Sequence, residues 1–121
     1  MAERKGIILC GHGSRDALWR QPIEAVAARI IAAQPGLPVR CGYLEMQQPD
    51  LAAAAAELVS AGVTDVTVVP MLLGTGKHVR EDLPRLLQRL RQVHPGVHFK
   101  LQIPVGEEPR VLELLAQIAL E

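Results

Sequence analysis

Aromatic residues and an excess of charge are both missing from this sequence. One Trp, one Tyr and one Phe among 121 residues leave too few rings for a base-stacking surface, and 13 Lys and Arg balance 13 Asp and Glu. Proteins that bind nucleic acids usually carry a basic patch or stacking aromatic side chains. The composition therefore argues against a nucleic-acid partner.

Cysteine is scarce, and no apolar run is long. Cys10 and Cys41 form no Cys-x-x-Cys motif and do not suggest a disulfide framework. No uncharged apolar stretch reaches the ~20 residues that cross a bilayer. The short apolar run after the basic first residues does not fit a signal peptide either. These features predict a cytoplasmic protein with no membrane segment.

The length predicts one domain over residues 1–121, since 121 residues can bury a single core but are too few for two. Short apolar runs alternate with segments whose apolar residues repeat at helical spacing, as in β-α units with a parallel sheet. We expect four strands, at residues 6–10, 39–44, 65–69 and 97–103. We expect a helix after each strand, with apolar stripes within residues 23–31, 51–59, 83–90 and 111–118.

The strands differ in their pattern, and the difference predicts their order. Residues 7–9 and 66–69 are nearly continuous apolar runs, which indicates central strands covered by helices on both faces. Residues 39–43 and 97–103 alternate apolar and polar side chains, as half-exposed edge strands do. With right-handed crossovers, the simplest arrangement is a three-layer α/β domain with a parallel sheet of order 2-1-3-4, as in flavodoxin-like folds.

Two histidines follow neighbouring strands of this predicted sheet. His12 follows the first strand and His78 follows the third, and adjacent strands lie only ~4.8 Å apart. Glu45 follows the second strand, on the other side of the first. The three side chains can therefore share the carboxyl edge of the sheet, where open α/β sheets bind ligands. A single histidine there is more often an ordinary surface residue, but two at adjacent strand ends favour a site.

The types of side chain at this edge indicate which ligands it suits. Neutral imidazoles with at most one carboxylate prefer Co²⁺, Ni²⁺, Fe²⁺ or Zn²⁺ to Mg²⁺ or Ca²⁺. Asp82 could orient His78, but we expect it to cap the following helix instead. The surrounding basic residues predict positive walls for an acidic small molecule, or simply a solvated basic face; they are Arg15, Arg20, Lys77, Arg80 and Arg85.

Two familiar nucleotide motifs are imperfect here. Gly11-x-Gly13-x-x-Asp16 places an acidic side chain where the dinucleotide fingerprint needs its third glycine. The segment from Met71 to His78 has neither the first glycine nor the final Ser or Thr of a P-loop. The sequence therefore predicts no nucleotide cofactor.

Three motifs, taken in order and spacing, resemble a known family. They are Gly11-His12-Gly13-Ser14-Arg15, Tyr43-Leu44-Glu45, and Pro70-Met71-Leu72-Leu73 leading to Gly76-x-His78 and Asp82-Leu83-Pro84. The chain is similar over essentially its full length to the ATP-independent class II tetrapyrrole chelatases. The match is to their short form, the sirohydrochlorin cobaltochelatases.

This resemblance implies insertion of a divalent metal, most often cobalt and in related members nickel or iron, into sirohydrochlorin, an acidic ring, in cobalamin biosynthesis. It implies that His12 accepts a proton and delivers the metal, and that His78 is the second metal ligand. It also implies that Glu45 faces the substrate and that a loop lines its pocket, through Leu72, Leu73, Gly74, Thr75, Gly76 and Lys77. No cofactor beyond the substrate metal is implied. Because long members contain two such α/β halves, a homodimer is expected.

Two other functions remain open at this point. One is a metal carrier or partner subunit that presents His12 and His78 without acting on a macrocycle. The other is a histidine-type phosphohydrolase, since a His-Gly pair follows the first strand. Gly11 stands where that class needs an arginine before the histidine, so this second alternative is disfavoured.

Overall fold

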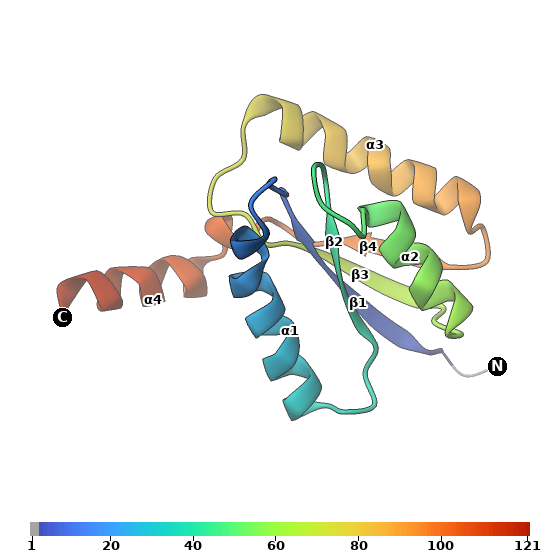
Figure 1. Ribbon diagram of the computed structural model, residues 1–121, viewed down its shortest axis with the longest axis horizontal. Helices are drawn as coiled ribbons and strands as arrows, with labels where there is room; N and C mark the ends of the chain where they lie inside the picture. Colours follow the sequence, from blue (N-terminus) through green and yellow to red (C-terminus); the bar gives the residue numbers. More distant parts are fainter. Residues whose placement is uncertain (1–2) are drawn as a thin grey trace.

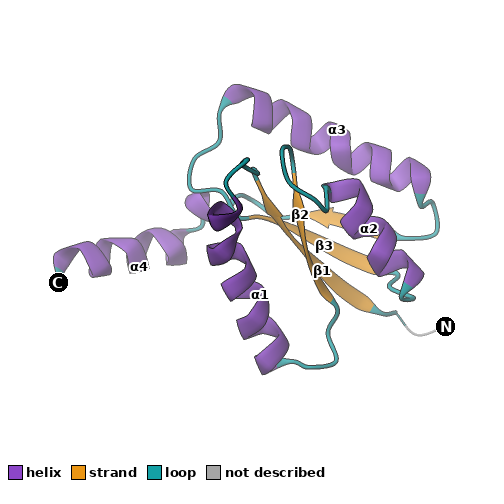
Figure 2. Cartoon of the chain, viewed as in Figure 1, coloured by secondary structure: helices purple, strands orange, loops and turns teal. Residues whose placement is uncertain are grey.

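The computed structural model describes residues 3–121 as one α/β domain (Figures 1 and 2). All strand pairs are parallel, and the sheet order is β2-β1-β3-β4, which confirms the predicted topology. The strands are β1 (Lys5–Gly11), β2 (Val39–Tyr43), β3 (Asp65–Pro70) and β4 (His98–Leu101). The helices are η1 (Ala17–Arg20), α1 (Gln21–Ala33), α2 (Leu51–Ser60), α3 (Lys77–Val93), η2 (Val105–Glu107) and α4 (Pro109–Leu120).

Helix α3 begins earlier than its apolar stripe indicates. Its first residue is Lys77 and its N-cap is Gly76, which contributes no side-chain cap. Asp82 therefore lies inside the helix, and the expectation that it caps the helix is wrong. The first turns of α3 are polar and exposed, so they carry no apolar signal, and Pro84 is accommodated within the helix. As a result, His78 sits on the first turn of α3 and not in the preceding loop.

One face of the sheet carries the hydrophobic core. Helices α2 and α3 cover it, and their side chains meet those of the sheet there without access to solvent. Fully buried residues alternate along β3, with Val66 and Val68 facing this core. The core includes Ile8, Cys10, Leu58, Val66, Val68, Leu83, Leu87 and Phe99. This packing fixes α3, and with it the histidine at its N-terminal end.

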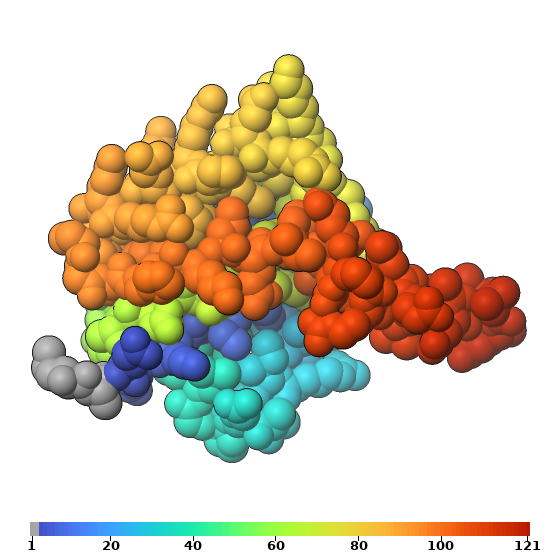
Figure 3. Space-filling model, turned by 180° about the vertical axis from the view of Figure 1, so that it is seen from behind, coloured from blue at the N-terminus to red at the C-terminus, as the bar shows by residue number. Residues whose placement is uncertain are grey.

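The other face is covered only in part. Helix α1 packs on β1 and β2 and buries Leu9 and Tyr43, each 2% exposed. Helix α4 does not return to the sheet: it projects from the body of the molecule, and none of its residues is buried (Figures 1 and 3). Thr67 and Val69 of β3 are consequently only half-buried. The expectation that helices cover both faces of the third strand is therefore wrong.

Within residues 3–121, no helix is both long enough and apolar enough to cross a bilayer.

Candidate active site

The backbone places His12 beside Glu45. Parallel pairing of β1 with β2 continues beyond the strands, because the N–H of Leu44 donates to the carbonyl of Gly11 (3.0 Å). One step further, the N–H of Glu45 donates to the carbonyl of His12 (3.1 Å). The two side chains then meet, with 2.9 Å between His12 Nε2 and Glu45 Oε1, and both are about half exposed. The sequence thus builds an imidazole–carboxylate pair from two strand ends.

Gly13 is the residue that permits this close approach of the two loops. Its φ is +97°, and a Cβ atom on it would lie 1.7 Å from the carbonyl oxygen of Glu45. Only glycine fits, both because of the left-handed backbone and because of the contact. Met46, next to Glu45, also has a left-handed φ of 63°, which is unfavourable for a residue with a side chain. The loop geometry is therefore held by the surrounding structure at some conformational cost.

The other polar residues of the first motif serve the local structure. The Asp16 carboxylate accepts a hydrogen bond from the N–H of Leu18 (2.9 Å) and caps η1. The Ser14 hydroxyl accepts one from the N–H of Asp16 (3.1 Å). These bonds turn the chain away from β1 just after His12, which leaves the imidazole at the edge of the sheet.

His12, Glu45 and His78 line the same cavity, of about 570 Å³, which we call the polar cavity. The sequence predicted that these three side chains converge, and the structure brings them to one opening. The remaining lining comes from Leu44 and from α3, through Val79, Asp82, Arg85, Leu86 and Arg89. Sequence reasoning missed Arg89; its position four residues after Arg85, on the same helical face, was the available signal.

His12 also lines a second cavity, of about 560 Å³, which we call the apolar cavity. It lies on the side of η1 and α1, and three predicted loop residues reach it: Leu72, Leu73 and Gly74. Its other lining residues are Gly13, Ser14, Trp19, Pro22, Ile23, Tyr43, Gln47 and Met71. Trp19 and Leu73 are 71% and 68% exposed, so the cavity has apolar side chains at a solvent-accessible position.

Within residues 3–121, two buried polar atoms near this cavity have no hydrogen-bond partner: the hydroxyl of Tyr43 and the Oε1 atom of Gln47. Burial is the main reason why the pKa of Tyr43 rises to about 12; the nearby Cys41 and Glu24 contribute to this rise, and Arg20 opposes it. Tyr43 therefore remains a neutral hydroxyl at physiological pH.

The rest of the predicted substrate loop faces elsewhere. Thr75 lines a separate cavity together with Arg80 and Glu107, which are paired to each other at 3.0 Å. Gly76 is the N-cap of α3, and Lys77 is its exposed first residue. Neither Thr75, Gly76 nor Lys77 lines either cavity next to His12.

The described residues contain no group of three or more His, Cys, Asp or Glu side chains close enough to hold a metal ion as they stand. The site instead offers two exposed imidazoles and one carboxylate around an open cavity. Cys10 is buried in the core, and burial raises the pKa of its thiol to about 12, so it offers no thiolate. Both Cys10 and Cys41 are free thiols.

The chain is similar to known proteins over almost its whole length. The CbiX family model matches residues 6–121. A curated relative from Methanococcoides burtonii, named sirohydrochlorin cobaltochelatase, is 30% identical over 128 residues, which cover 100% of this chain and 95% of the relative.

Two solved structures extend these relationships to the fold. A cobalamin (vitamin B12) biosynthesis CbiX protein from Marinobacter aquaeolei has a TM-score of 0.83 and 32% identity, over 96% of this chain and 94% of that one. The sirohydrochlorin chelatase SirB from Bacillus subtilis subspecies spizizenii, in complex with cobalt, has a TM-score of 0.75 and 27% identity. That match covers 97% of this chain but 50% of SirB. The chain belongs to the CbiX family, which confirms the resemblance to short-form class II chelatases that its motifs indicated.

Proposed function

We propose that this protein inserts a divalent metal ion into sirohydrochlorin, without ATP. The observation that carries the proposal is the pairing of His12 with Glu45, at 2.9 Å, at the same cavity as His78. The names of the CbiX relatives support the reaction class and the substrate. We propose cobalt as the metal and cobalamin biosynthesis as the pathway. Nickel and iron are the other ions that this donor set accommodates.

His12 and His78 hold the incoming ion in the polar cavity. Two imidazoles leave several coordination positions open, which suits an ion that must pass to another ligand and not stay bound. Because Nε2 of His12 faces Glu45, its Nδ1 is the nitrogen left for the ion or for a substrate proton. Glu45 orients the ring of His12, as carboxylates do beside metal-binding histidines.

Insertion also requires a destination for protons. Two pyrrole N–H protons leave the ring as the divalent ion enters, so the ring gains one metal and loses two protons. Imidazole is the side chain that most readily accepts a proton near neutral pH, and His12 takes the first one. Glu45 contacts His12 and can pass that proton on to solvent, because its side chain is 49% exposed, and His12 is then free to accept the second proton.

The macrocycle binds against the apolar cavity. A flat ring buries its faces on apolar side chains, and this cavity offers Trp19, Leu72 and Leu73 beside His12. The cavity is within the ~300–1,000 Å³ range of small-molecule sites. Carboxylates at the edge of the ring pair with Arg85 and Arg89, which line the polar cavity that also borders His12. Thr75, Gly76 and Lys77 shape the loop from outside the two cavities.

The working form that we propose is a homodimer in the cytoplasm. SirB is about twice as long as this chain, so a second copy would supply the matching half. The two free thiols, Cys10 and Cys41, are those expected in a reducing compartment.

Anaerobic absorption spectroscopy of sirohydrochlorin mixed with Co²⁺ tests the reaction. The wild-type protein should accelerate the spectral change, and His12→Ala should slow it by ~10²-fold or more, the scale of a lost general base. His78→Ala should raise the Co²⁺ concentration needed for half-maximal rate. His94→Ala is the matched control, because this histidine lies at the opposite end of α3, against Phe99.

The same experiment separates the other functions. Tight Co²⁺ binding with no effect on the spectrum of sirohydrochlorin would indicate a metal carrier and overturn the proposal. Phosphate-ester hydrolysis that disappears in His12→Ala would instead indicate a phosphohydrolase.

A further inference from the structure

The two histidines of the polar cavity differ in what holds their rings. His12 is paired with Glu45, with 2.9 Å between Nε2 and Oε1. Within the described chain, the other ion pair of a histidine joins His98 to Asp65 at 3.2 Å, at the amino ends of β4 and β3. Among those residues His78 therefore has no carboxylate partner, although it lines the same cavity as His12.

A metal-binding imidazole normally has such a partner. When one ring nitrogen binds an ion, the other carries a hydrogen and donates it to a carboxylate, a backbone carbonyl or water. A carboxylate in this place fixes the orientation of the ring and strengthens its hold on the metal. Glu45 is in this place beside His12. A second acceptor is therefore required for His78.

Asp82 is the carboxylate in position to serve His78. Glu45 and Asp82 are the acidic residues that line the polar cavity, and Glu45 already contacts His12. Asp82 follows His78 by four residues within α3, so the two side chains lie on the same helical face, with Cβ atoms about 5–6 Å apart. A rotation of the two side chains is then sufficient to bring the carboxylate to the ring.

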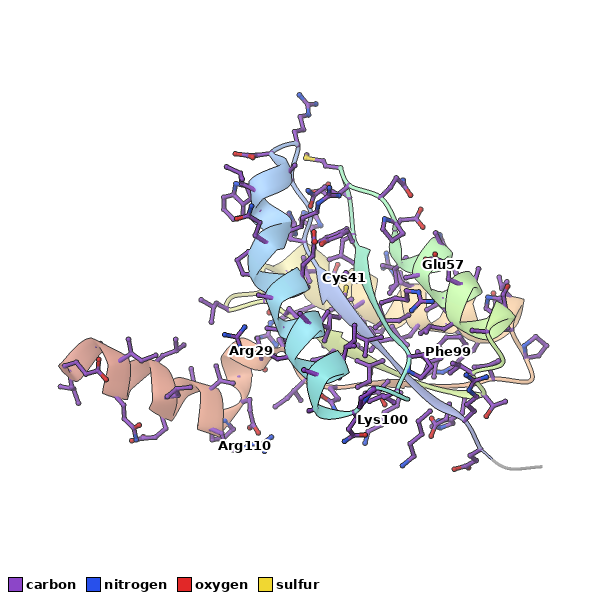
Figure 4. All side chains as sticks on the ribbon, turned by 60° about the horizontal axis from the view of Figure 1, so that its bottom comes forward. Arg29, Cys41, Glu57, Phe99, Lys100 and Arg110 are labelled. Carbon is purple, nitrogen blue, oxygen red and sulfur yellow. The ribbon has the colours of Figure 1, made fainter. Side chains whose placement is uncertain are left out.

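The helix that carries both side chains is fixed by the core. Leu87 of α3 is buried there with Phe99 of β4, which is 2% exposed and which Figure 4 labels in the interior of the molecule. Near the far end of the helix, Arg91 Nη2 donates to the carbonyl of Phe99 (3.0 Å). The backbone spacing of His78 and Asp82 is therefore constant, and only their side chains need to move.

Asp82 has a weak partner in the metal-free chain. Its Oδ1 atom lies 3.8 Å from Nη1 of Arg85, beyond hydrogen-bond distance, and the two side chains are 57% and 72% exposed. An exposed pair of this kind contributes little to stability. Arg85 also lines the polar cavity, where the carboxylates of the macrocycle would bind. A macrocycle carboxylate that pairs with Arg85 would thus release Asp82.

We propose that Asp82 is a positioning residue, whose carboxylate gives up Arg85 and accepts a hydrogen bond from the imidazole of His78 when that ring binds the metal ion. The inference rests on the function proposed above, because it assigns an ion to His78. It gives each histidine its own carboxylate: Glu45 holds His12 before the ion arrives, and Asp82 holds His78 afterwards. The exchange also leaves Arg85 to the macrocycle, so that binding of the ion and binding of the ring support each other.

Titration calorimetry with Co²⁺ and no sirohydrochlorin tests the role of Asp82. Asp82→Asn should weaken Co²⁺ binding by ~10-fold or more, the scale of a lost carboxylate beside a metal-binding histidine, and Asp82→Glu should restore most of the affinity. Glu81→Gln is the matched control, because it removes the same charge from the next residue, which is exposed and does not line the polar cavity. It should bind Co²⁺ as the wild type does. Equal affinities of Asp82→Asn and the wild type would overturn the proposal.

A second series separates support of the ring from simple attraction between charges. In a His78→Ala background, Asp82→Asn should change the Co²⁺ affinity by less than ~2-fold, because the ring that Asp82 supports is gone. The full loss of affinity in that background would show that Asp82 acts on the ion through its charge alone, and the proposal would be wrong.

Arg85→Gln tests the exchange of partners. It should strengthen Co²⁺ binding by about 2- to 5-fold, the scale of an exposed ion pair, beyond any gain in Arg89→Gln, which removes a charge from the same cavity. In an Asp82→Asn background this excess should disappear, and an excess that persists there would contradict the exchange.

All three series omit sirohydrochlorin, which separates this inference from the proposed reaction. A protein that binds Co²⁺ as described but does not insert it would refute the reaction and leave the role of Asp82 standing. A wild-type protein that does not bind Co²⁺ would overturn both.

Discussion

The two cavities that meet at His12 differ in lining and in origin. The polar cavity is built by α3 and by the loop after β2, and it carries Glu45, His78, Arg85 and Arg89. The apolar cavity is built by η1, α1 and the loop after β3, and it carries Trp19, Leu72 and Leu73. The two are of similar size, so their chemistry and not their volume distinguishes them. The contrast shows that one imidazole, that of His12, borders both a charged and an apolar surface.

The supports of the two cavities also differ. The helix that forms much of the polar cavity, α3, is anchored in the hydrophobic core through Leu83 and Leu87. The apolar cavity depends on Trp19 and Leu73, both largely exposed, and on α1, which has no buried residue. The wall formed by α3 is thus anchored in the core, whereas the wall of the apolar cavity is largely exposed to solvent. Altering one side at a time should therefore separate metal binding from macrocycle binding.

Changing Gly13 should break both cavities and have the largest effect. A Cβ atom there would collide with the Glu45 carbonyl in a backbone that already has a φ of +97°. Gly13→Ala should lower the free energy of unfolding by ~1–3 kcal/mol, and it should also slow metal insertion because His12 and Glu45 separate. Chemical denaturation and the insertion assay measure the two effects. Gly36→Ala is the control, since a Cβ atom at Gly36 meets nothing within 4 Å. Equal behaviour of the two variants would contradict this account of the loop.

Changing Glu45 should affect the polar cavity alone. Glu45→Gln keeps a side chain of the same shape beside His12 but removes its charge. We expect Co²⁺ to bind ~10–100-fold more weakly, as for other carboxylates next to metal-binding histidines. Titration calorimetry with Co²⁺ measures this change, while metal-free sirohydrochlorin should bind as it does to the wild type. A loss of macrocycle binding without a loss of Co²⁺ affinity would contradict the assignment of Glu45 to metal binding.

Variants of the polar cavity and of the apolar cavity should differ in how their KM for sirohydrochlorin depends on salt. Arg89→Ala should raise the KM for sirohydrochlorin by ~10-fold at low ionic strength, and the difference from wild type should shrink as salt screens the charge. Leu73→Ser should raise the KM by an amount that salt does not reduce. Initial rates measured across a range of salt concentrations compare them. The same salt response in both variants would remove the distinction between the cavities.

The smallest effect concerns Tyr43, one of the residues that line the apolar cavity. Its buried hydroxyl has no hydrogen-bond partner among the described residues, so Tyr43→Phe should be as stable as the wild type at pH 7, or more stable by up to ~1 kcal/mol. Folding raises the pKa of Tyr43 from 10.0 to about 12, so the unfolded chain ionises first. The wild type should therefore lose stability relative to Tyr43→Phe as the pH rises from 10 to 12. A variant that is less stable at pH 7 would show that the hydroxyl is satisfied.

The sequence was sufficient to predict the sheet order and the convergence at its carboxyl edge, because both follow from strand order. The apolar runs at residues 7–9 and 66–69 identified the central strands, and the parallel arrangement then placed His12, Glu45 and His78 at one edge. The start of α3 could not be predicted, because its first turns are polar and its apolar stripe begins only at Leu83. For the same reason Asp82 was misread as a cap.

Two other features depend on tertiary contacts that a single sequence does not reveal. The apolar stripe of α4 reads like that of any helix packed on its own sheet. The turn at Gly106, in contact with the Leu73 backbone, sends it outward instead. The division of the loop after β3 is similar: Leu72 to Gly74 reach the cavity beside His12, whereas Thr75 to Lys77 turn towards α3. Consecutive residues gave no signal for that change of direction.

X-ray absorption at the cobalt edge tests most directly whether His12 and His78 grip the same ion. Co²⁺ bound to the wild-type protein should show two imidazole ligands, and Co²⁺ bound to His12→Ala or to His78→Ala should show one. An unchanged number of imidazole ligands in either variant would contradict the account, because the ion would then be bound somewhere other than between these two histidines.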